Sequence, residues 1–262
     1  MAIYLFDQRK RLEQSLSRVK TVYLFCDLDG TLARIARRPD LVRLGKKNHK
    51  LLQNLASNKK FEIAVISGRS NDQLKRIVNV DGIYYAGNHG FEISGPRLNF
   101  KHPEAVKMEK FLKAMASELK FKLESIPGVI VEDKGLTVSV HYRIVKPSQR
   151  EEVVHIVKGI VAKYKALRLT TGKMIVEVRP RVRWNKGLAA LKILRTLRKR
   201  GAVIFIGDDI TDEDAFRSLA GHITIKVMHK RAKTKARYYL RSVGDVWCFI
   251  NVLAKASLQS GN

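Results

Sequence analysis

The sequence has few cysteines and no long apolar segment. Its two cysteines, Cys26 and Cys248, do not make a disulfide framework in a chain of 262 residues. We interpret Cys26, which lies in an apolar stretch, as a small hydrophobic side chain. No apolar run approaches the roughly 20 residues of a transmembrane helix. The N-terminus lacks the apolar segment of a cleavable signal, so we expect a cytoplasmic protein with no membrane partner.

Acidic residues are scarce relative to basic ones. The chain carries 24 Asp and Glu against 51 Lys and Arg, a formal net charge of +27. Seven Lys or Arg occur in residues 34–50, and seven more occur in residues 226–241. Such runs bind nucleic acid or attract small anions. Because no aromatic-interleaved basic motif or zinc pattern is present, we favour attraction of an anionic substrate and expect no nucleic-acid partner.

Two carboxylates follow the first apolar strand of the chain. Residues 22–26 predict a strand buried on both faces, and Asp27, Asp29 and Gly30 come directly after it. Residues two apart at an extended strand end point the same way. Both carboxylates should therefore face the space beyond the strand, where open α/β sheets bind their ligands. Adjacent anions are unfavourable without a cation, so the pair predicts a hard metal ion such as Mg²⁺.

Strand and helix patterns alternate along the first and last parts of the chain. Residues 61–66 predict a second buried strand, which ends in Ser67, and Ser70 can cap the helix that follows. Two strand–helix units at this spacing predict parallel βαβ topology. Further strands are predicted at residues 83–86, 202–206 and 222–227, and helices at 5–19, 46–57, 185–200 and 243–253.

The middle of the chain has a different pattern. Helices are predicted at residues 103–124 and 148–164, and strand pairs at 128–132 with 136–143 and 167–170 with 173–178. Helices with antiparallel strands differ from the parallel units on either side. We therefore predict an α/β protein with a Rossmann-like parallel-sheet core, formed by residues 1–95 and 181–262, and an α+β cap inserted at residues 96–180.

The polar clusters at the predicted strand ends should converge in a parallel sheet. Asp208 would complete an oxygen-ligand Mg²⁺ site with Asp27 and a backbone carbonyl near Asp29. Ser67 and the amides after Asp27 could hold phosphate oxygens. Lys186, at the start of a helix that Asn185 can cap, could neutralise a phosphate dianion and an attacking carboxylate.

Four clusters in this order resemble the four motifs of the haloacid dehalogenase-type phosphatases: DLDGTL, ISGR, Lys186 and GDDITDED. More narrowly, AGNHGFEI, EDKGLTVSVHYR, EVRPRVRWNKG and FIGDDITDEDAF are together similar to trehalose-6-phosphate phosphatases. The resemblance extends over about residues 21–227, cap included. The loop ARIARRPD is more basic than this family usually shows, and the C-terminal stretch resembles no segment of it.

The resemblance implies a mechanism. Asp27 would be the nucleophile that forms an aspartyl-phosphate intermediate. Asp29 would protonate the leaving sugar oxygen and then deprotonate the attacking water. Mg²⁺, Lys186 and Ser67 would stabilise charge on the transferring phosphoryl group. The residues expected beside the metal and the lysine, without ligating the metal, are Asp209 and Asp212.

The cap is expected to recognise the sugar. Glu132 and Lys134 flank one turn, Glu177 and Arg179 close the last strand, and each pair is two apart, so each can face one side. Carboxylates and amines suit sugar hydroxyls, and the resemblance places Glu132, Lys134 and Glu177 on the distal glucose. The alternative is that these four residues form salt bridges within the cap. The substrate-binding residues expected in the core are Gly30, Thr31, Gly68, Arg69, Asn88 and His89.

The expected function is Mg²⁺-dependent hydrolysis of trehalose 6-phosphate to trehalose and phosphate. One alternative is a phosphatase for another sugar or compatible-solute phosphate, such as glucosylglycerol phosphate. A second is a basic nucleic-acid-binding protein on a degenerate phosphatase scaffold, although all four motifs are intact. No feature of the sequence predicts an oligomeric state.

Overall fold

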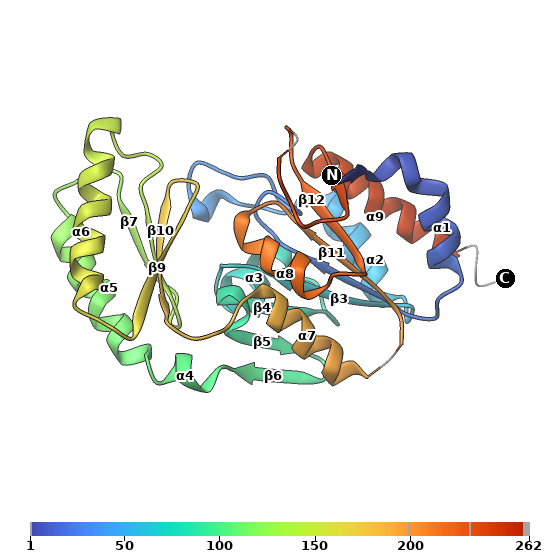
Figure 1. Cartoon of the computed structure of the whole chain (residues 1–262), viewed down its shortest axis with the longest axis horizontal. Helices are drawn as coiled ribbons and strands as arrows, with labels where there is room; N and C mark the ends of the chain where they lie inside the picture. The colour runs from blue at the N-terminus through green and yellow to red at the C-terminus, as the bar shows by residue number, and fades with distance from the viewer. Residues whose placement is uncertain (1, 199, 231, 259–262) are drawn as a thin grey trace. The chain divides into compact units, whose positions relative to one another are not determined.

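The structure is a computed structural model that describes residues 2–198, 200–230 and 232–258 (Figure 1). The chain divides into two compact units. Of the described residues, those within 2–36, 41–100 and 184–258 form the core, and those within 37–40 and 101–183 form the cap. Residues 96–100, expected in the cap, lie in the core because β6 (Leu98–Lys101) extends the core sheet. Within the described ranges, no helix has the length and apolar character needed to cross a membrane.

The core is built on a nine-stranded sheet within the part of the chain that the structure describes. Its strand order is β1-β13-β12-β11-β2-β3-β4-β5-β6. Neighbours from β1 to β4 run parallel, and β5 is antiparallel to β4, which confirms the predicted mostly parallel α/β fold. The strands other than β6 are β1 (Ile3–Tyr4), β2 (Val22–Cys26), β3 (Phe61–Ile66), β4 (Tyr84–Gly87), β5 (Glu92–Gly95), β11 (Ala202–Gly207), β12 (Ile223–Val227) and β13 (Tyr238–Leu240).

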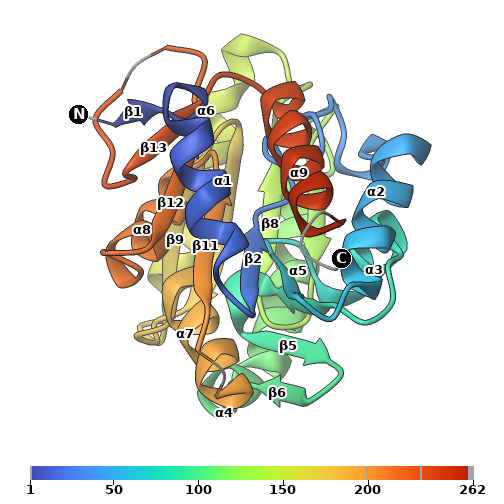
Figure 2. The same cartoon turned by 90° about the vertical axis from the view of Figure 1, so that its right-hand side faces the viewer.

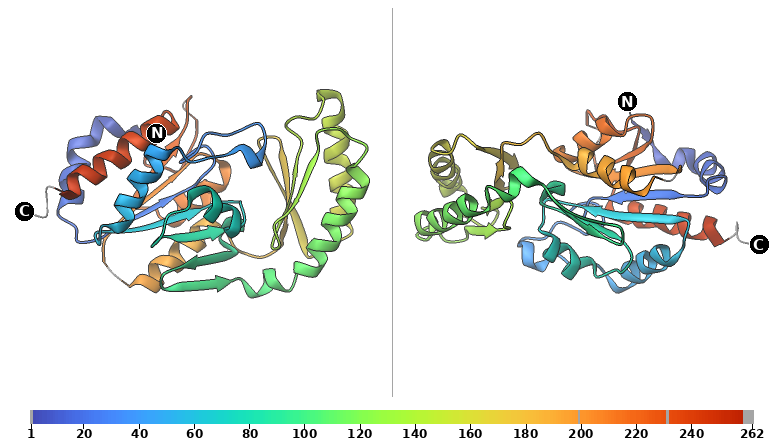
Figure 3. Two further views of the ribbon diagram at one scale, coloured as in Figure 1. Left: turned by 180° about the vertical axis from the view of Figure 1, so that it is seen from behind. Right: turned by 90° about the horizontal axis from the view of Figure 1, so that it is seen from below.

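Helices cover both faces of the core sheet (Figure 3). Successive side chains of a strand point to opposite faces, so Leu24 and Cys26 of β2 pack in one apolar layer while Tyr23 and Phe25 pack in the other. Figure 2 shows α1 and α9 beside each other on the first layer. That layer is formed by α1 (Arg9–Ser17), α2 (Lys46–Ser57), α3 (Asn71–Val78) and α9 (Val243–Leu258). The second is formed by α7 (Lys186–Leu197) and α8 (Glu213–Ser218).

Several predicted core elements have the expected bounds, and others were missed. The strands at 22–26 and 61–66 and the helix at 46–57 are confirmed, as are Ser70 and Asn185 as helix caps. The helix expected at 5–19 is a 3-10 turn followed by a shorter α-helix, and β5, β6 and β13 were not predicted. The 3-10 helices of the chain's described part are η1 (Leu5–Gln8), η2 (Pro39–Leu41), η3 (Asn88–Gly90), η4 (Pro147–Gln149) and η5 (Ile210–Asp212).

The cap is a four-stranded antiparallel sheet, in the order β7-β8-β10-β9, with helices packed on it. Its apolar layer includes Val138 and Val140 of β8 and Val176 and Val178 of β10, which contact the apolar faces of α5 and α6. The alternate residues of these strands, Ser139 and Glu177 among them, point to the other face. The elements are α4 (Pro103–Val106), α5 (Glu109–Leu123), β7 (Ile130–Asp133), β8 (Val138–His141), α6 (Arg150–Ala162), β9 (Leu167–Gly172) and β10 (Ile175–Pro180).

Candidate active site

Three neighbouring strands of the core end at one edge of the sheet with polar residues beyond them. β2 pairs in parallel with β11 on one side and β3 on the other, up to its last residue, Cys26. Asp27 follows β2, Ser67 follows β3, and Asp208 follows β11. The predicted convergence of these residues thus arises from the strand order, at the edge where open α/β sheets bind ligands.

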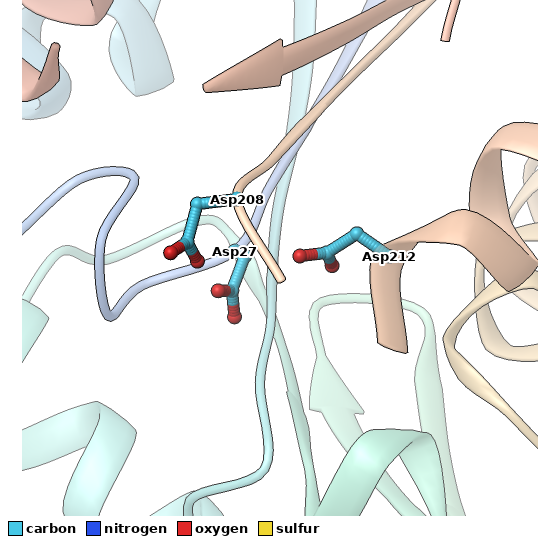
Figure 4. A group of neighbouring side chains, drawn as sticks. All are labelled: Asp27, Asp208 and Asp212. Atoms are coloured by element: carbon cyan, nitrogen blue, oxygen red, sulfur yellow. The ribbon is translucent and has the colours of Figure 1, made fainter. Parts of the chain in front are cut away.

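Three carboxylates meet at this edge. Oxygens of Asp27, Asp208 and Asp212 all lie within 4.8 Å of one another, and Figure 4 shows these side chains converging. Asp27 is 4% exposed and Asp212 is fully buried. The sequence analysis expected Asp27, Asp208 and a backbone carbonyl near Asp29 at the metal, with Asp212 beside it. In the structure, the third carboxylate of the cluster is that of Asp212. We call these three residues the carboxylate cluster.

Lys186 binds two members of the carboxylate cluster. Its Nζ lies 2.9 Å from Asp27 Oδ1 and 2.8 Å from Asp212 Oδ1. The lysine is the first residue of α7, whose N-cap Asn185 accepts a hydrogen bond from the Leu188 amide at 3.0 Å. Burial acts to lower the pKa of Lys186, but the carboxylates of Asp212 and Asp27 raise it above its ordinary value. The ammonium therefore stays charged and faces the predicted nucleophile.

The charge balance of the site fits a divalent cation. Burial raises the pKa of Asp27 well above its ordinary value, Lys186 opposes that rise, and Asp212, Asp208 and Asp29 add to it. Three carboxylates against one ammonium leave negative charge that a bound cation would neutralise, which would also keep Asp27 ionised. Carboxylate oxygens are the donors that hard divalent cations prefer. The carboxylate cluster could therefore hold such an ion.

Gly30 and Thr31 shape the turn after Asp27. Gly30 has φ +86°, and a Cβ atom there would collide with the carboxylate of Asp208, so only glycine lets the turn approach this closely. The Gly30 amide donates to Ala33 O at 2.7 Å, and the Thr31 amide donates to Leu28 O at 3.2 Å. The Thr31 hydroxyl is buried and has no hydrogen-bond partner among the described residues. A bound phosphate oxygen would satisfy it.

Asp29 lies outside the carboxylate cluster and is held by an arginine. Arg69 donates from Nε to Asp29 Oδ2 at 2.7 Å and from Nη2 to Asp29 Oδ1 at 2.8 Å. Such a two-pronged pair fixes both the position and the plane of the carboxylate. Arg69 was expected to bind substrate, and in this structure its guanidinium contacts the predicted general acid. The side chain of Asp29 is 32% exposed, so a proton can reach it.

The other loop residues predicted to bind substrate are buried against the loop of Ser67. The His89 amide donates to Ser67 O at 2.8 Å, and the Asn88 amide donates to Arg69 O at 2.7 Å. A Cβ atom at Gly68 would come within 2.6 Å of His89 Nε2, so the imidazole packs directly on this glycine. Asn88 is fully buried and His89 is 7% exposed. The structure thus brings these residues together as a support for Ser67.

Asp209 and Lys226 stabilise the loop that carries Asp212. The sequence analysis did not identify Lys226 as part of the site. The Asp209 amide donates to Asp212 Oδ2 at 2.9 Å. The Asp209 carbonyl accepts from Lys226 Nζ at 2.7 Å, and the same ammonium lies 3.2 Å from Glu213 Oε1. Lys226 is only 9% exposed. Because Lys226 lies in a run of basic residues, its sequence context indicated an exposed side chain. No residue spacing marked it as a neighbour of the site.

The four predicted sugar-binding residues of the cap lie among ion pairs. Glu177 Oε1 accepts from Lys134 Nζ at 2.5 Å, and Glu177 Oε2 accepts from Arg179 Nε at 2.5 Å. Glu132 Oε2 lies 3.0 Å from His141 Nε2. The side chains of Lys134, Glu177 and Arg179 are each less than a tenth exposed. Cap salt bridges are therefore present. Sequence reasoning missed His141 as a polar neighbour of Glu132; it pairs with Ile130, two residues before Glu132 on the neighbouring strand.

The chain is similar to proteins of a known family. The trehalose-phosphatase family profile matches residues 25–243. A trehalose-phosphate phosphatase of Mycobacterium tuberculosis is 40% identical over 242 residues, which are 88% of this chain and 61% of that protein. The probable trehalose-phosphate phosphatase E of Arabidopsis thaliana is 32% identical over 255 residues, which are 91% of this chain and 72% of that protein.

Solved structures show the same fold. The C-terminal domain of a trehalose-6-phosphate phosphatase from C. albicans superposes with a TM-score of 0.81, covering 97% of this chain and 98% of that one at 23% identity. A trehalose-6-phosphate phosphatase of Aspergillus fumigatus gives a TM-score of 0.65 at 25% identity, covering 98% of this chain and 100% of that one. With the family profile matched across core and cap, the chain belongs to the trehalose-phosphatase family.

Proposed function

We propose that this chain is a phosphoric monoester hydrolase that converts trehalose 6-phosphate to trehalose and phosphate with Mg²⁺ as its cation. The observation that carries the proposal is the buried Asp27 carboxylate, held by Lys186 at 2.9 Å beside two further carboxylates. The names of the relatives, which share up to 40% identity with this chain over 242 residues, support the sugar phosphate as substrate. The basic surface would then attract an anionic substrate.

Asp27 and Asp29 would divide the chemistry between them. A carboxylate oxygen of Asp27 attacks the phosphorus, the bond to the sugar oxygen breaks, and Asp29 gives that oxygen a proton. Asp29 then takes a proton from the water that attacks the aspartyl phosphate, which releases phosphate and restores Asp27. Arg69 orients the Asp29 carboxylate for both steps, because it binds both of its oxygens.

The other groups of the site would stabilise the transferring phosphoryl group. Lys186 contributes a fixed positive charge, and the Ser67 and Thr31 hydroxyls can donate to phosphoryl oxygens. The Gly30 and Thr31 amides are used within the turn, so the predicted phosphate-binding amides would be those of the two residues directly after Asp27. Mg²⁺, held by the carboxylate cluster and by the predicted carbonyl near Asp29, would supply further positive charge when bound.

The cap would select the sugar. We propose that Glu132, Lys134 and Glu177 contact the distal glucose and that Arg179 supports them. Glu177 already binds Lys134 and Arg179, so one carboxylate fixes the direction of two cations. Charged groups with fixed directions suit hydroxyls that both donate and accept. No nucleic-acid partner is proposed, and the cytoplasm stays the predicted compartment.

A panel of sugar phosphates with Mg²⁺, read out by phosphate release, tests this function. We expect trehalose 6-phosphate to be hydrolysed with the highest kcat/KM, and glucosylglycerol phosphate and glucose 6-phosphate to be poorer substrates. Asp27→Asn should lose at least about a hundredfold in kcat, since it removes the nucleophile. Asp72→Asn is the matched control, because Asp72 is an exposed carboxylate on α3. Turnover by Asp27→Asn at the wild-type rate would exclude covalent catalysis by Asp27.

A further inference from the structure

The turn after β4 has an unusual backbone. Asn88, His89 and Gly90 follow one another with φ values of +49°, +58° and +89°. Two of the three carry side chains, and L-residues enter this left-handed region at a cost. Strained conformations of this kind persist only where the surroundings determine them, and they gather at functional sites. The contacts that fix this turn therefore indicate what it does.

The strained turn is bonded to the loop that carries the predicted phosphate-binding serine. The amides of Asn88 and His89 donate to the carbonyls of Arg69 and Ser67. On the other side, the Ser67 amide donates to Ala86 O at 2.9 Å. The loop of Ser67 is thus held through its backbone, and a change in the 88–90 turn must move it.

One carboxylate fixes the strained turn. Glu92 Oε1 accepts from Asn88 Nδ2 at 2.8 Å and from the Asn71 amide at 2.8 Å. Asn71 Oδ1 in turn accepts from the Gly87 amide at 2.7 Å. Glu92 therefore ties the turn to the first residue of α3, immediately after the loop of Ser67. Hydrogen bonds to an ionised acceptor are stronger than neutral ones, which suits an anchor that must hold strained backbone.

We infer that Glu92 is a positioning residue for phosphate binding. It acts through Asn88 and the Ser67 loop, and it touches no reacting atom. The inference rests on the proposed function, because it assigns Glu92 to the site that binds the phosphoryl group. Loss of the Glu92 carboxylate releases the 88–90 turn and displaces the Ser67 hydroxyl.

Calorimetric binding of inorganic phosphate, with Mg²⁺ present, measures this role without turnover. Glu92→Ala should raise the Kd for phosphate between about tenfold and a hundredfold, the usual cost of misplacing a site group by about an ångström. Glu92→Gln keeps an acceptor oxygen and should recover most of the affinity. The matched control is Glu62→Ala, since Glu62 is a carboxylate of the same sheet that binds Arg97 at 2.8 Å. It should bind phosphate as the wild type does.

A double-mutant cycle separates positioning from general loosening. Asn88→Gly tolerates the positive φ but removes the side-chain amide group that donates to Glu92. If both residues act through this one bond, Asn88→Gly weakens phosphate binding, and Asn88→Gly/Glu92→Ala is no weaker than Glu92→Ala alone. Thermal unfolding shows which variants are folded, and if Glu92→Ala is not, phosphate binding by Asn88→Gly decides.

The outcomes are distinct. Wild-type affinity in folded Glu92→Ala, or in Asn88→Gly, overturns the inference and leaves the proposed function intact. Fully additive losses in the cycle also overturn it, because the residues would then act separately. A wild-type protein that binds no phosphate at all overturns the proposed function first and this inference with it.

Discussion

Replacing Lys186 by methionine should destabilise the protein far more than replacing an ordinary lysine. The side chain is 3% exposed and pairs with Asp27 and Asp212 at 2.9 and 2.8 Å. Methionine fills similar space, but it leaves the carboxylates buried without a cation. Breaking a buried ion pair by removing one partner costs about 3–5 kcal/mol, which corresponds to a fall in Tm of roughly 6–20 °C in a chain of this size.

The assay is thermal and urea unfolding in EDTA, so that no bound metal compensates for the missing ammonium. Lys163→Met is the matched control, because Lys163 is 65% exposed and pairs with Glu118 at 3.1 Å. An exposed pair of that kind contributes between about 0 and 1 kcal/mol. The double variant Lys186→Met/Asp212→Asn removes one uncompensated charge and keeps an acceptor oxygen for the loop. It should recover part of the lost stability without recovering activity.

Two results would refute this reasoning. One is a Lys186→Met protein that unfolds, in EDTA, within about 1 kcal/mol of the wild type, as the control should. The other is a double variant less stable than Lys186→Met, which would mean that the Asp212 carboxylate stabilises the loop regardless of the lysine. The first result would leave Lys186 with no part in balancing the charge of the site, and the second would show that the charge left on Asp212 is not what destabilises Lys186→Met.

Three further predictions concern the turn, the cap and the cysteines. Gly30→Ala should stay folded by circular dichroism but lose at least about a hundredfold in kcat, since its Cβ would strike the Asp208 carboxylate of the carboxylate cluster; near-normal turnover would contradict this. Glu132→Ala and Lys134→Ala should each lose ~1–3 kcal/mol in kcat/KM for trehalose 6-phosphate but little for p-nitrophenyl phosphate, and parallel losses on both substrates would assign these residues to cap stability. Mass spectrometry after iodoacetamide treatment of the native protein should find Cys248 alkylated and Cys26 intact, because Cys26 is buried and its thiol pKa is raised by burial and by the adjacent aspartate; rapid labelling of Cys26 would show that the strand opens.

The sequence predicted the parallel core because its strands are short continuous apolar runs that end in polar residues. Residues 22–26 and 61–66 have this pattern, and the structure confirms both strands. β5 and β6, the last two strands at one end of the sheet, carry no such run, since they mix polar with apolar residues. β13 has only three residues and lies within a basic stretch, so no apolar run marked it as a strand. Pairing with the rest of the sheet, which is a tertiary effect, makes these segments strands.

Residue spacing predicted which residues meet where the motifs fix the backbone positions. It did not predict the contacts of long side chains. Asp27, Asp208 and Lys186 meet because strand ends and a helix start fix their Cα positions. Arg69 was expected to bind substrate, and in the structure its guanidinium contacts Asp29, which the sequence analysis did not predict. Residue spacing cannot determine such a choice, because a flexible side chain can reach several partners that are remote in sequence.

The strand order also sets the order in which this protein can fold as it is synthesised. The central strand β2 pairs with β3, which follows it closely, and with β11, which spans Ala202–Gly207. Nearly all of the cap is one continuous stretch, residues 101–183, and can fold before that second partner leaves the ribosome. Asp27 thus emerges early, while Lys186 and Asp208 arrive late. A nascent chain cannot assemble its catalytic site until most of the protein has been made, since domains fold as units in order of synthesis.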